Sequence, residues 1–532
     1  MSSESSEFPL SSARRWTITV TVMVVSVLQI LDTSVTNVAL PHIQGALSAG
    51  VEEVSWVLTS YLAANAIVLP ATGWLSARLG RRRLFLLCTI VFTVSSLLSG
   101  MAPSVEFLIA MRILQGLGGG PVIPIAQAIL WEIFPPHQRG MAMAVWGLGI
   151  VLAPTFGPTL GGWVTDNWSW RWIFYINLPI GVVGFFMAGL FLFDSPHAKR
   201  AGRIDLPGLG LMIVGFAALQ LVLDRGERED WFDSGFIAAL AVVATVALIA
   251  FVIRELRCDN PLLDLAVFAD RNFTLGSVVM SLAGFGFYAS MLLLALYTQK
   301  LMSYDAWTSG LVLAPSGIGQ ALMLLLIGRL VNRTDQRLLL AFGVLMNGLA
   351  TYLMSNVTLG SDFWSLAWPR LLQGIGMGCI FVPLQTLALA FVPMSQLPNA
   401  TAAFSVVRNL GGSVGVAVAT TLLTRRAQVH QTTLVAHVDV WDPETAARLG
   451  RWTDHFSTHG ADAFTAGRQA LAMLYRDAAG QAQVLAFIDD FRLLALVYAS
   501  LILLIPFMRR VRPEPAHRPA GEAVAPLPAP ND

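Results

Sequence analysis

Four charged residues lie inside long apolar stretches of this sequence: Asp32, Arg112, Arg370 and Arg408. An ionised side chain at the centre of an apolar membrane helix costs about 2.5–3.5 kcal/mol, so each of them needs an ionic partner or a wet cavity. Asp32 is the carboxylate of this set and can take up and release a proton. Burial favours the protonated form of a carboxylate, whereas a nearby arginine favours the ionised form. An acid that alternates between these surroundings would load a proton on one side of a membrane and release it on the other.

Arg112 is the cation that we expect to modulate this exchange, because its sequence context recurs around Arg370. The alternative for each charged residue is a structural ion pair. Several polar residues of the apolar stretches could line a cavity, or could form interhelical hydrogen bonds worth under about 2 kcal/mol each. These residues are Gln29, Asn37, Asn65, Gln115, Gln127, Gln320, Gln373, Gln385 and, among the charged residues, Arg408.

The composition excludes a soluble multi-domain enzyme. Of the 532 residues, 55% are hydrophobic and 13% charged, about half the charged fraction typical of soluble proteins. The mean hydropathy is +0.64. The sequence therefore predicts an all-α polytopic membrane protein. With a net charge of +1 and no basic and aromatic patch, we expect no nucleic-acid partner. No metal-ligand cluster, phosphate-binding loop or nucleophile–base pair is present in the sequence, so we expect that the protein is not an enzyme and binds no metal or cofactor. We expect a proton gradient to be its energy source.

Windows almost free of charge predict fourteen membrane spans. They lie near residues 17–40, 54–76, 84–102, 106–130, 140–163, 172–193, 206–223, 234–253, 273–296, 307–328, 338–356, 364–391, 402–424 and 491–508. An even number of spans puts both termini on one side. The loops and terminal segments on that side carry twenty Lys and Arg, against four in the short loops on the other side. Because cytoplasmic loops are enriched in these residues, we expect both termini in the cytoplasm.

The predicted organisation has five parts. A cytoplasmic segment (1–16) precedes a six-helix bundle (17–193), two inserted helices (194–256) and a second six-helix bundle (257–508), and a disordered cytoplasmic tail (509–532) follows. The second bundle includes a long periplasmic loop at 425–490. Its apolar residues after Asp462 have helical spacing, which predicts one or two amphipathic helices lying on the outer face; a plain linker is the alternative.

An internal repeat supports this division. The stretch Arg112–Gly120 recurs 258 residues later as Arg370–Gly378, and Gly73–Arg83 has a fainter copy 255 residues later at Gly328–Arg337. In spans the offset is eight, whereas six-helix repeats alone would give six. Two helices are therefore inserted, and the architecture is 6 + 2 + 6.

The fifth predicted span carries small residues four apart, on one helical face: Gly149, Ala153, Gly157 and Gly161. Such a face lets another helix approach closely. Pro154 and Pro158 remove backbone donors and permit a bend. Ordinary tight packing is the alternative to a gating role for this segment, which ends at Gly162.

Together these motifs resemble the major facilitator superfamily, in particular the fourteen-span drug:proton antiporters of the EmrB/QacA type. Gly73–Arg83, with Gly73, Arg78, Gly80 and Arg81, is similar to the loop motif between spans 2 and 3. Arg112–Gly120 and Gly149–Gly162 resemble the span-4 and span-5 motifs, the latter typical of exporters. Three further stretches resemble motifs of the fourteen-span family: Leu31–Pro41, Trp170–Gly181 and Leu223–Phe232.

The resemblance implies the major facilitator fold and a proton-coupled efflux pump for small lipophilic drugs in the bacterial inner membrane, among membrane lipids. It implies a role in proton transfer for Arg112, and a periplasmic adaptor and an outer-membrane channel as partners. The loop motif departs from the family at Ala77, where an aspartate is usual, and at Asn332 in its second copy. A dedicated exporter of one metabolite, siderophore or antibiotic is the main alternative. An importer is disfavoured by the span-5 motif.

Overall fold

The computed structural model describes residues 11–194, 202, 205–331, 333–438 and 441–511, and all regular secondary structure in these ranges is helical. Most of the two predicted terminal segments and Asn332 therefore lie outside the described residues. Within these described ranges, thirteen helices are long and apolar enough to cross a membrane, and one bent pair, if it is one span, brings the number to fourteen. The prediction of a fourteen-span, all-α membrane protein is thus confirmed.

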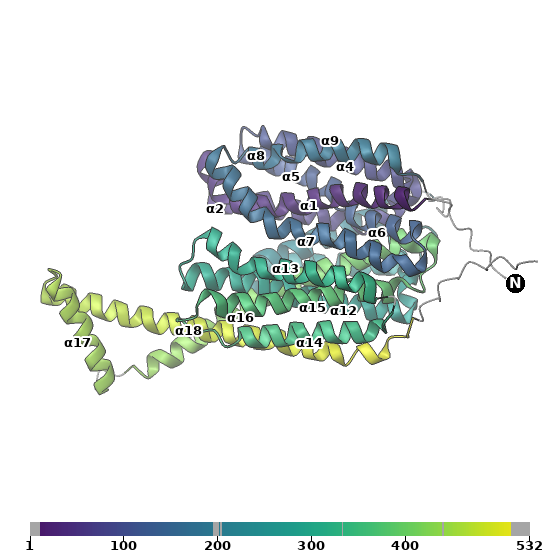
Figure 1. Ribbon diagram of the computed structural model, residues 1–532. Helices are drawn as coiled ribbons and strands as arrows, with labels where there is room; N and C mark the ends of the chain where they lie inside the picture. Colours follow the sequence, from purple (N-terminus) through teal and green to yellow (C-terminus); the bar gives the residue numbers. More distant parts are fainter. Residues whose placement is uncertain (1–10, 195–201, 203–204, 332, 439–440, 512–532) are drawn as a thin grey trace, which may run out of the picture.

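The first group of helices precedes the insertion and packs into one bundle (Figure 1). Within it, α1 packs on α7 and α9, while α5 lies between α2 and α4. We call this group the N-terminal bundle. Its helices are α1 (Ser12–Ala46), α2 (Val51–Val68), α3 (Thr72–Leu79), α4 (Arg81–Gly100), α5 (Val105–Gly119), α6 (Val122–Ile133), α7 (Pro136–Asn167), α8 (Trp172–Tyr175) and α9 (Asn177–Phe191).

The second group, the C-terminal bundle, repeats this packing. Here α15 lies between α13 and α14, and α12 packs on α16. The helices are α12 (Arg271–Leu296), α13 (Ala306–Leu330), α14 (Gln336–Met354), α15 (Phe363–Leu389), α16 (Leu397–Ala436), α17 (Pro443–Thr458) and α18 (Ala463–Ile502). Both described chain ends lie at the same end of the molecule, which we call the terminal end (Figure 1).

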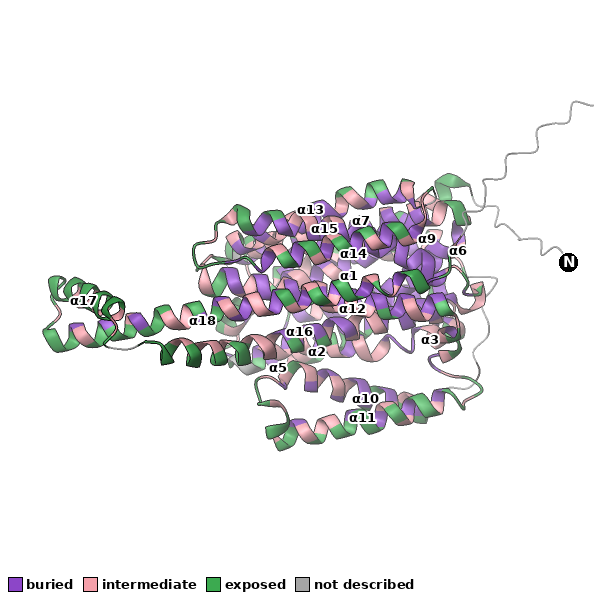
Figure 2. Ribbon diagram, turned by 90° about the horizontal axis from the view of Figure 1, so that it is seen from below, coloured by how far each residue is buried: buried purple, intermediate pink, exposed green. Residues whose placement is uncertain are grey.

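The two inserted helices, α10 (Leu206–Arg225) and α11 (Gly235–Glu255), form a hairpin on one side of the molecule (Figure 2). Helix α10 contacts α2 of one bundle and α16 of the other. Near its last turn, the Arg225 guanidinium lies 4.6 Å from the centre of the Trp56 ring of α2. In the following turn the Trp231 indole donates to Thr421 of α16 at 3.0 Å. The insertion therefore bridges the seam between the bundles.

The predicted second span is broken. Helices α2 and α3 meet at 63° around a short break that contains Pro70. Proline has no backbone N–H and its ring clashes with the preceding turn, so the helical ladder stops there. By contrast, α1 continues through Pro41 as far as Ala46.

The described residues of the segment predicted as a loop at 425–490 are mostly helical, but the expectation that its helices lie on the outer face is wrong. Helices α16 and α18 continue beyond the bundle as a projection, and α17 joins them at its tip (Figures 1 and 2). Helices α16 and α18 have 40 residues each, which gives each a length of about 60 Å, twice the ~30 Å hydrocarbon thickness. Apolar helical spacing alone does not distinguish a helix on a membrane surface from one that extends away from it.

Candidate functional site

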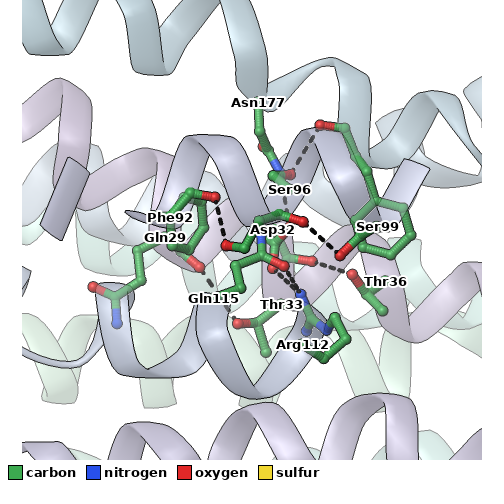
Figure 3. A network of polar contacts seen from close by, with 12 residues as sticks. Gln29, Asp32, Thr33, Thr36, Phe92, Ser96, Ser99, Arg112, Gln115 and Asn177 are labelled. Carbon is green, nitrogen blue, oxygen red and sulfur yellow. Dashed lines mark hydrogen bonds and ion pairs between the residues drawn. The ribbon is translucent and has the colours of Figure 1, made fainter. Parts of the chain in front are cut away.

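Asp32 lies in the interior of the N-terminal bundle and is 1% exposed. Its carboxylate faces protein and not lipid, and it accepts hydrogen bonds from two other helices (Figure 3). Arg112 of α5 donates to Oδ2 at 2.5 Å, and Gln115, one turn later, donates to Oδ1 at 2.9 Å. Asn177, the first residue of α9, donates to Oδ1 at 2.7 Å. This geometry brings Asp32 and Arg112 into direct contact, and the role of Arg112 in the proton exchange stays a prediction.

Arg112 is held by groups besides the carboxylate. Its Nε donates to the Val57 carbonyl of α2 at 3.0 Å, and its Nη1 also donates to the Gln115 side-chain oxygen at 2.8 Å. The guanidinium lies 4.3 Å from the centre of the Tyr61 ring, within range of a cation–π interaction. These contacts fix the arginine, so the carboxylate faces a preformed set of donors.

The hydrogen-bonding pattern suits a carboxylate anion, which only accepts, whereas a protonated acid must donate once. All three side chains around Asp32 donate to it. A proton on either oxygen would remove the negative charge with which Arg112 pairs. Removing one member of a buried ion pair costs about 3–5 kcal/mol, so Asp32 and Arg112 must separate together with a compensating change. This coupling of protonation to side-chain movement is what the site can do chemically.

The C-terminal bundle contains the same arrangement without the acid. At the repeat offset of 258, Ser290 takes the place of Asp32, while Arg370 and Gln373 correspond to Arg112 and Gln115. The Ser290 hydroxyl accepts from Gln373 at 2.7 Å and from Arg370 at 3.4 Å. Among the described residues, Arg370 makes no ion pair with a carboxylate. The repeat therefore has one site with an acid and one counterpart, around Ser290, without an acid.

The other predicted cavity residues are not gathered at one place. Gln115 donates a hydrogen bond to Asp32, and Gln373 belongs to the counterpart site around Ser290. Asn37 is exposed and Arg408 is half-buried, with a weak 3.4 Å hydrogen bond to its neighbour Asn409. The remaining residues are buried without contacting Asp32 through a hydrogen bond: Gln29, Asn65, Gln127 and Gln320.

Gln127 and Gln385 form a second pair at the repeat offset. Both are 1% exposed, and neither amide group of the two has a hydrogen-bond partner in the described part of the chain. Buried amides that lack protein partners need water or a bound molecule. These two glutamines are therefore available to a ligand, whereas Gln115 and Gln373 are occupied.

Sequence reasoning missed Asn177 and Ser96. Asn177 donates to Asp32 and also to the Ser96 hydroxyl at 3.0 Å, and Ser96 donates to the Phe174 carbonyl at 2.9 Å. Both residues are fully buried. Asn177 lies in the motif Trp170–Gly181, and a polar residue in an apolar span was the one signal that could have singled it out.

The loop motif between α2 and α4 lies against the other bundle. A Cβ atom on Gly73 would stand 2.9 Å from the Asn399 Cα atom at the start of α16, so only glycine fits this contact. Gly80 separates α3 from α4 and has φ +83°, a value that L-residues with side chains rarely adopt. The following Arg82 N–H donates to Asp194 at 3.1 Å.

The arginines of this motif differ in their surroundings. Arg81 is buried and pairs with Glu132 at the end of α6, whereas Arg78 is exposed. Ala77, at the position where the resembled family has an aspartate, contributes no charge. The ionic contact of this region is therefore the Arg81–Glu132 pair within the N-terminal bundle.

The glycine face of α7 packs on α1. A Cβ atom added to Gly149 would lie 2.6 Å from the Met23 side chain. A Cβ atom on Gly157 would lie 2.5 Å from the Ser34 side chain, and one on Gly161 would lie 2.9 Å from the Val35 side chain. Helix α7 continues through Pro154 and Pro158 without interruption. The predicted close approach of another helix is confirmed, and the partner is the helix that carries Asp32.

Comparison with known proteins agrees with this architecture. The family model of the Major Facilitator Superfamily matches residues 22–416. The multidrug export protein EmrB of Haemophilus influenzae is 40% identical over 437 residues, 82% of this chain and 86% of that protein. EmrB of Escherichia coli K12 is 38% identical over 440 residues, with the same coverage. The fatty acid resistance protein FarB of Neisseria gonorrhoeae is 38% identical over 446 residues, 83% of this chain and 88% of FarB.

A solved structure shows the same fold at low sequence identity. The crystal structure of the human organic anion transporter MFSD10 (TETRAN) aligns with a TM-score of 0.58, 15% identity and coverage of 91% of this chain and 99% of that chain. The helical architecture, the repeated arginine motif and these matches lead to one conclusion: the chain belongs to the major facilitator superfamily and, within it, to the EmrB-like transporters.

Proposed function

We propose that this multi-pass membrane protein is a drug:proton antiporter that exports lipophilic compounds across the bacterial cytoplasmic membrane. The relatives named for multidrug export, 38–40% identical over most of the chain, support the export of drugs. The observation that carries the coupling is the buried Asp32–Arg112 pair, because a proton on Asp32 removes the charge with which Arg112 pairs. Both termini are assigned to the cytoplasm on the excess of Lys and Arg in the loops of that side.

In this mechanism the two bundles rock about a central substrate site. A proton that enters from the periplasm and binds Asp32 releases Arg112, which favours one conformation. Drug binding from the cytoplasm or the inner leaflet favours the other. Coupling requires only that proton and drug each bind one conformation better than the other. Gln127 and Gln385 are the buried polar groups that we assign to the substrate site.

Everted membrane vesicles test the assignment of Asp32. With an imposed pH gradient, wild type should accumulate a fluorescent drug, and Asp32→Asn should lose gradient-driven uptake. Because the asparagine leaves Arg112 without a counter-ion, the variant's membrane level and melting temperature must be measured beside its transport. Asp166→Asn is the matched control, since Asp166 is exposed. Gradient-driven uptake by Asp32→Asn at the wild-type rate would contradict the assignment.

A dedicated exporter of one compound class is the second candidate, and the similarity to FarB favours it. A panel of unrelated lipophilic compounds, including fatty acids, separates the two functions in a strain without its own pumps. Protection against several unrelated compounds supports the multidrug function. Protection against fatty acids alone supports the dedicated exporter.

The α16–α18 projection is assigned as the contact for a periplasmic adaptor, which would complete the path with an outer-membrane channel. Large apolar side chains are exposed on its α18 part: Phe464, Leu471 and Tyr475, each 59% exposed or more. Exposed apolar groups of this kind mark binding surfaces. Deletion of residues 440–480 should abolish co-purification of the adaptor while transport in vesicles persists. Unchanged co-purification would count against this contact.

A further inference from the structure

A buried acid at the far end of the C-terminal bundle differs from the other buried acids. Among the described residues, four carboxylates are buried, and three of them accept at least one hydrogen bond. Both side-chain oxygens of the fourth, Asp490, lack any hydrogen-bond partner in the described part of the chain. The side chain is 1% exposed. The four are Asp32, Asp205, Glu255 and Asp490.

Asp490 lies on the face of α18 that packs into the bundle. The residues of the same face are apolar and buried: Phe487, Phe491 and Leu494. A span needs about 20 residues. Counted back from Phe507, where the candidate span ends, this length places Asp490 just inside the hydrocarbon, at the end away from the termini. At this end of the bundle α18 continues into the projection (Figure 1).

The charged groups of this interface are engaged by the neighbouring acid. Asp489 accepts from His430 of α16 at 2.9 Å and lies 3.5 Å from the Arg426 guanidinium of the same helix. Asp489 and Arg426 are the charged groups that act on Asp490. The other helices packed on α18, α12 and α14, contribute Leu293 and Met354 to the apolar cluster around it, and Tyr297 and Val357, which lie just beyond the ends of these two helices, belong to the same cluster.

An ionised carboxylate without a partner is not stable in such surroundings, whereas a neutral acid is tolerated. We propose that Asp490 is a second proton-binding site of the transporter, whose carboxyl group carries a proton in this conformation. It releases the proton when α16 and α18 separate enough to admit water or the Arg426 guanidinium. The inference rests on the proposed proton antiport and adds an acid to the bundle in which Ser290 replaces the acid of the repeat.

Infrared spectroscopy of the purified, full-length protein tests the protonation directly. In the difference spectrum between wild type and Asp490→Asn at neutral pH, we expect loss of the C=O band of a protonated carboxylic acid. Asp489→Asn is the matched control and should lose carboxylate bands instead, because Asp489 is paired with the Arg426 guanidinium. An unchanged acid band in Asp490→Asn, or loss of a carboxylate band, overturns the proposal. If the asparagine variant does not fold, Asp490→Glu must shift the acid band, and an unshifted band overturns the proposal equally.

Transport by reconstituted protein tests the release of this proton. Asp490→Asn should retain drug transport but carry fewer protons per drug than wild type, whereas Asp489→Asn should keep the wild-type ratio. An unchanged ratio in Asp490→Asn overturns the role in transport. The two proposals fail separately. If wild type moves no protons with the drug but Asp490→Asn loses the acid band, the proton site stands and the antiport function fails.

Discussion

The contact between α1 and α7 gives a sharp test through two adjacent glycines. A Cβ atom on Gly161 would lie 3.0 Å from the Val35 Cα atom and 3.1 Å from the Val35 carbonyl oxygen. Both are backbone atoms of α1 and cannot rotate away. A Cβ atom on Gly162 would meet only the Val38 side chain, at an ordinary 3.8 Å. Alanine therefore fits at 162 and does not fit at 161.

The free energies can be estimated from these distances. Alanine is better than glycine in a helix interior by about 1 kcal/mol, while overpacking a tight contact costs about 1–3 kcal/mol. Gly161→Ala should therefore lower the free energy of unfolding by up to about 2 kcal/mol. Gly162→Ala should leave it unchanged or raise it by up to about 1 kcal/mol.

Thermal unfolding of the detergent-purified variants measures this difference. Gly161→Ala should melt several degrees below wild type, and Gly162→Ala should melt at or above the wild-type temperature. A change of 1 kcal/mol in the free energy of unfolding shifts the melting temperature of a domain the size of one bundle by about 2–4 °C. Drug transport should fall in Gly161→Ala, because the helix that carries Asp32 is displaced. Equal melting temperatures for the two variants would refute the proposed packing of α1 on α7.

Two further predictions concern arginines. Arg112→Ala should impair vesicle transport more than Arg408→Ala, because Arg112 binds the Asp32 carboxylate whereas Arg408 makes one weak hydrogen bond; equal, mild losses would argue for structural roles of both. Hydrogen bonds from Arg254 hold the pKa of Asp205 below its usual range. The pair therefore stabilises the folded state fully above pH ~4, and this stabilisation is lost as the pH falls through the lowered pKa of Asp205. Arg254→Gln should lower the melting temperature at pH 7, and the difference from wild type should shrink in acid; a difference independent of pH would contradict this.

The spans and the central pair were predictable because their signals are strong. A charge in hydrocarbon is costly, so Asp32 and Arg112 stood out against apolar surroundings, and the recurrence at Arg370 marked the repeat. Hydropathy also gave the number of spans.

The other features of the fold and the site depend on contacts that the type of a single residue does not predict. Asn177 is one of many polar residues in the spans, and only the fold brings it to Asp32. Asp490 was assigned to a loop because charged residues precede it, and the structure instead continues α18 through it as one helix. The break at Pro70 was not predictable from the proline alone, because α1 continues through Pro41. The projection of α16 and α18 depends on the packing of neighbouring helices, which sequence periodicity does not contain.

Proton release on drug binding tests the central claim, the exchange of a proton at Asp32 for drug, most directly. Purified protein in weakly buffered detergent solution, with a pH indicator dye, should release protons when a transported drug is added. Asp32→Asn should still bind the drug but release fewer protons than wild type. Equal proton release by Asp32→Asn and wild type would contradict the account.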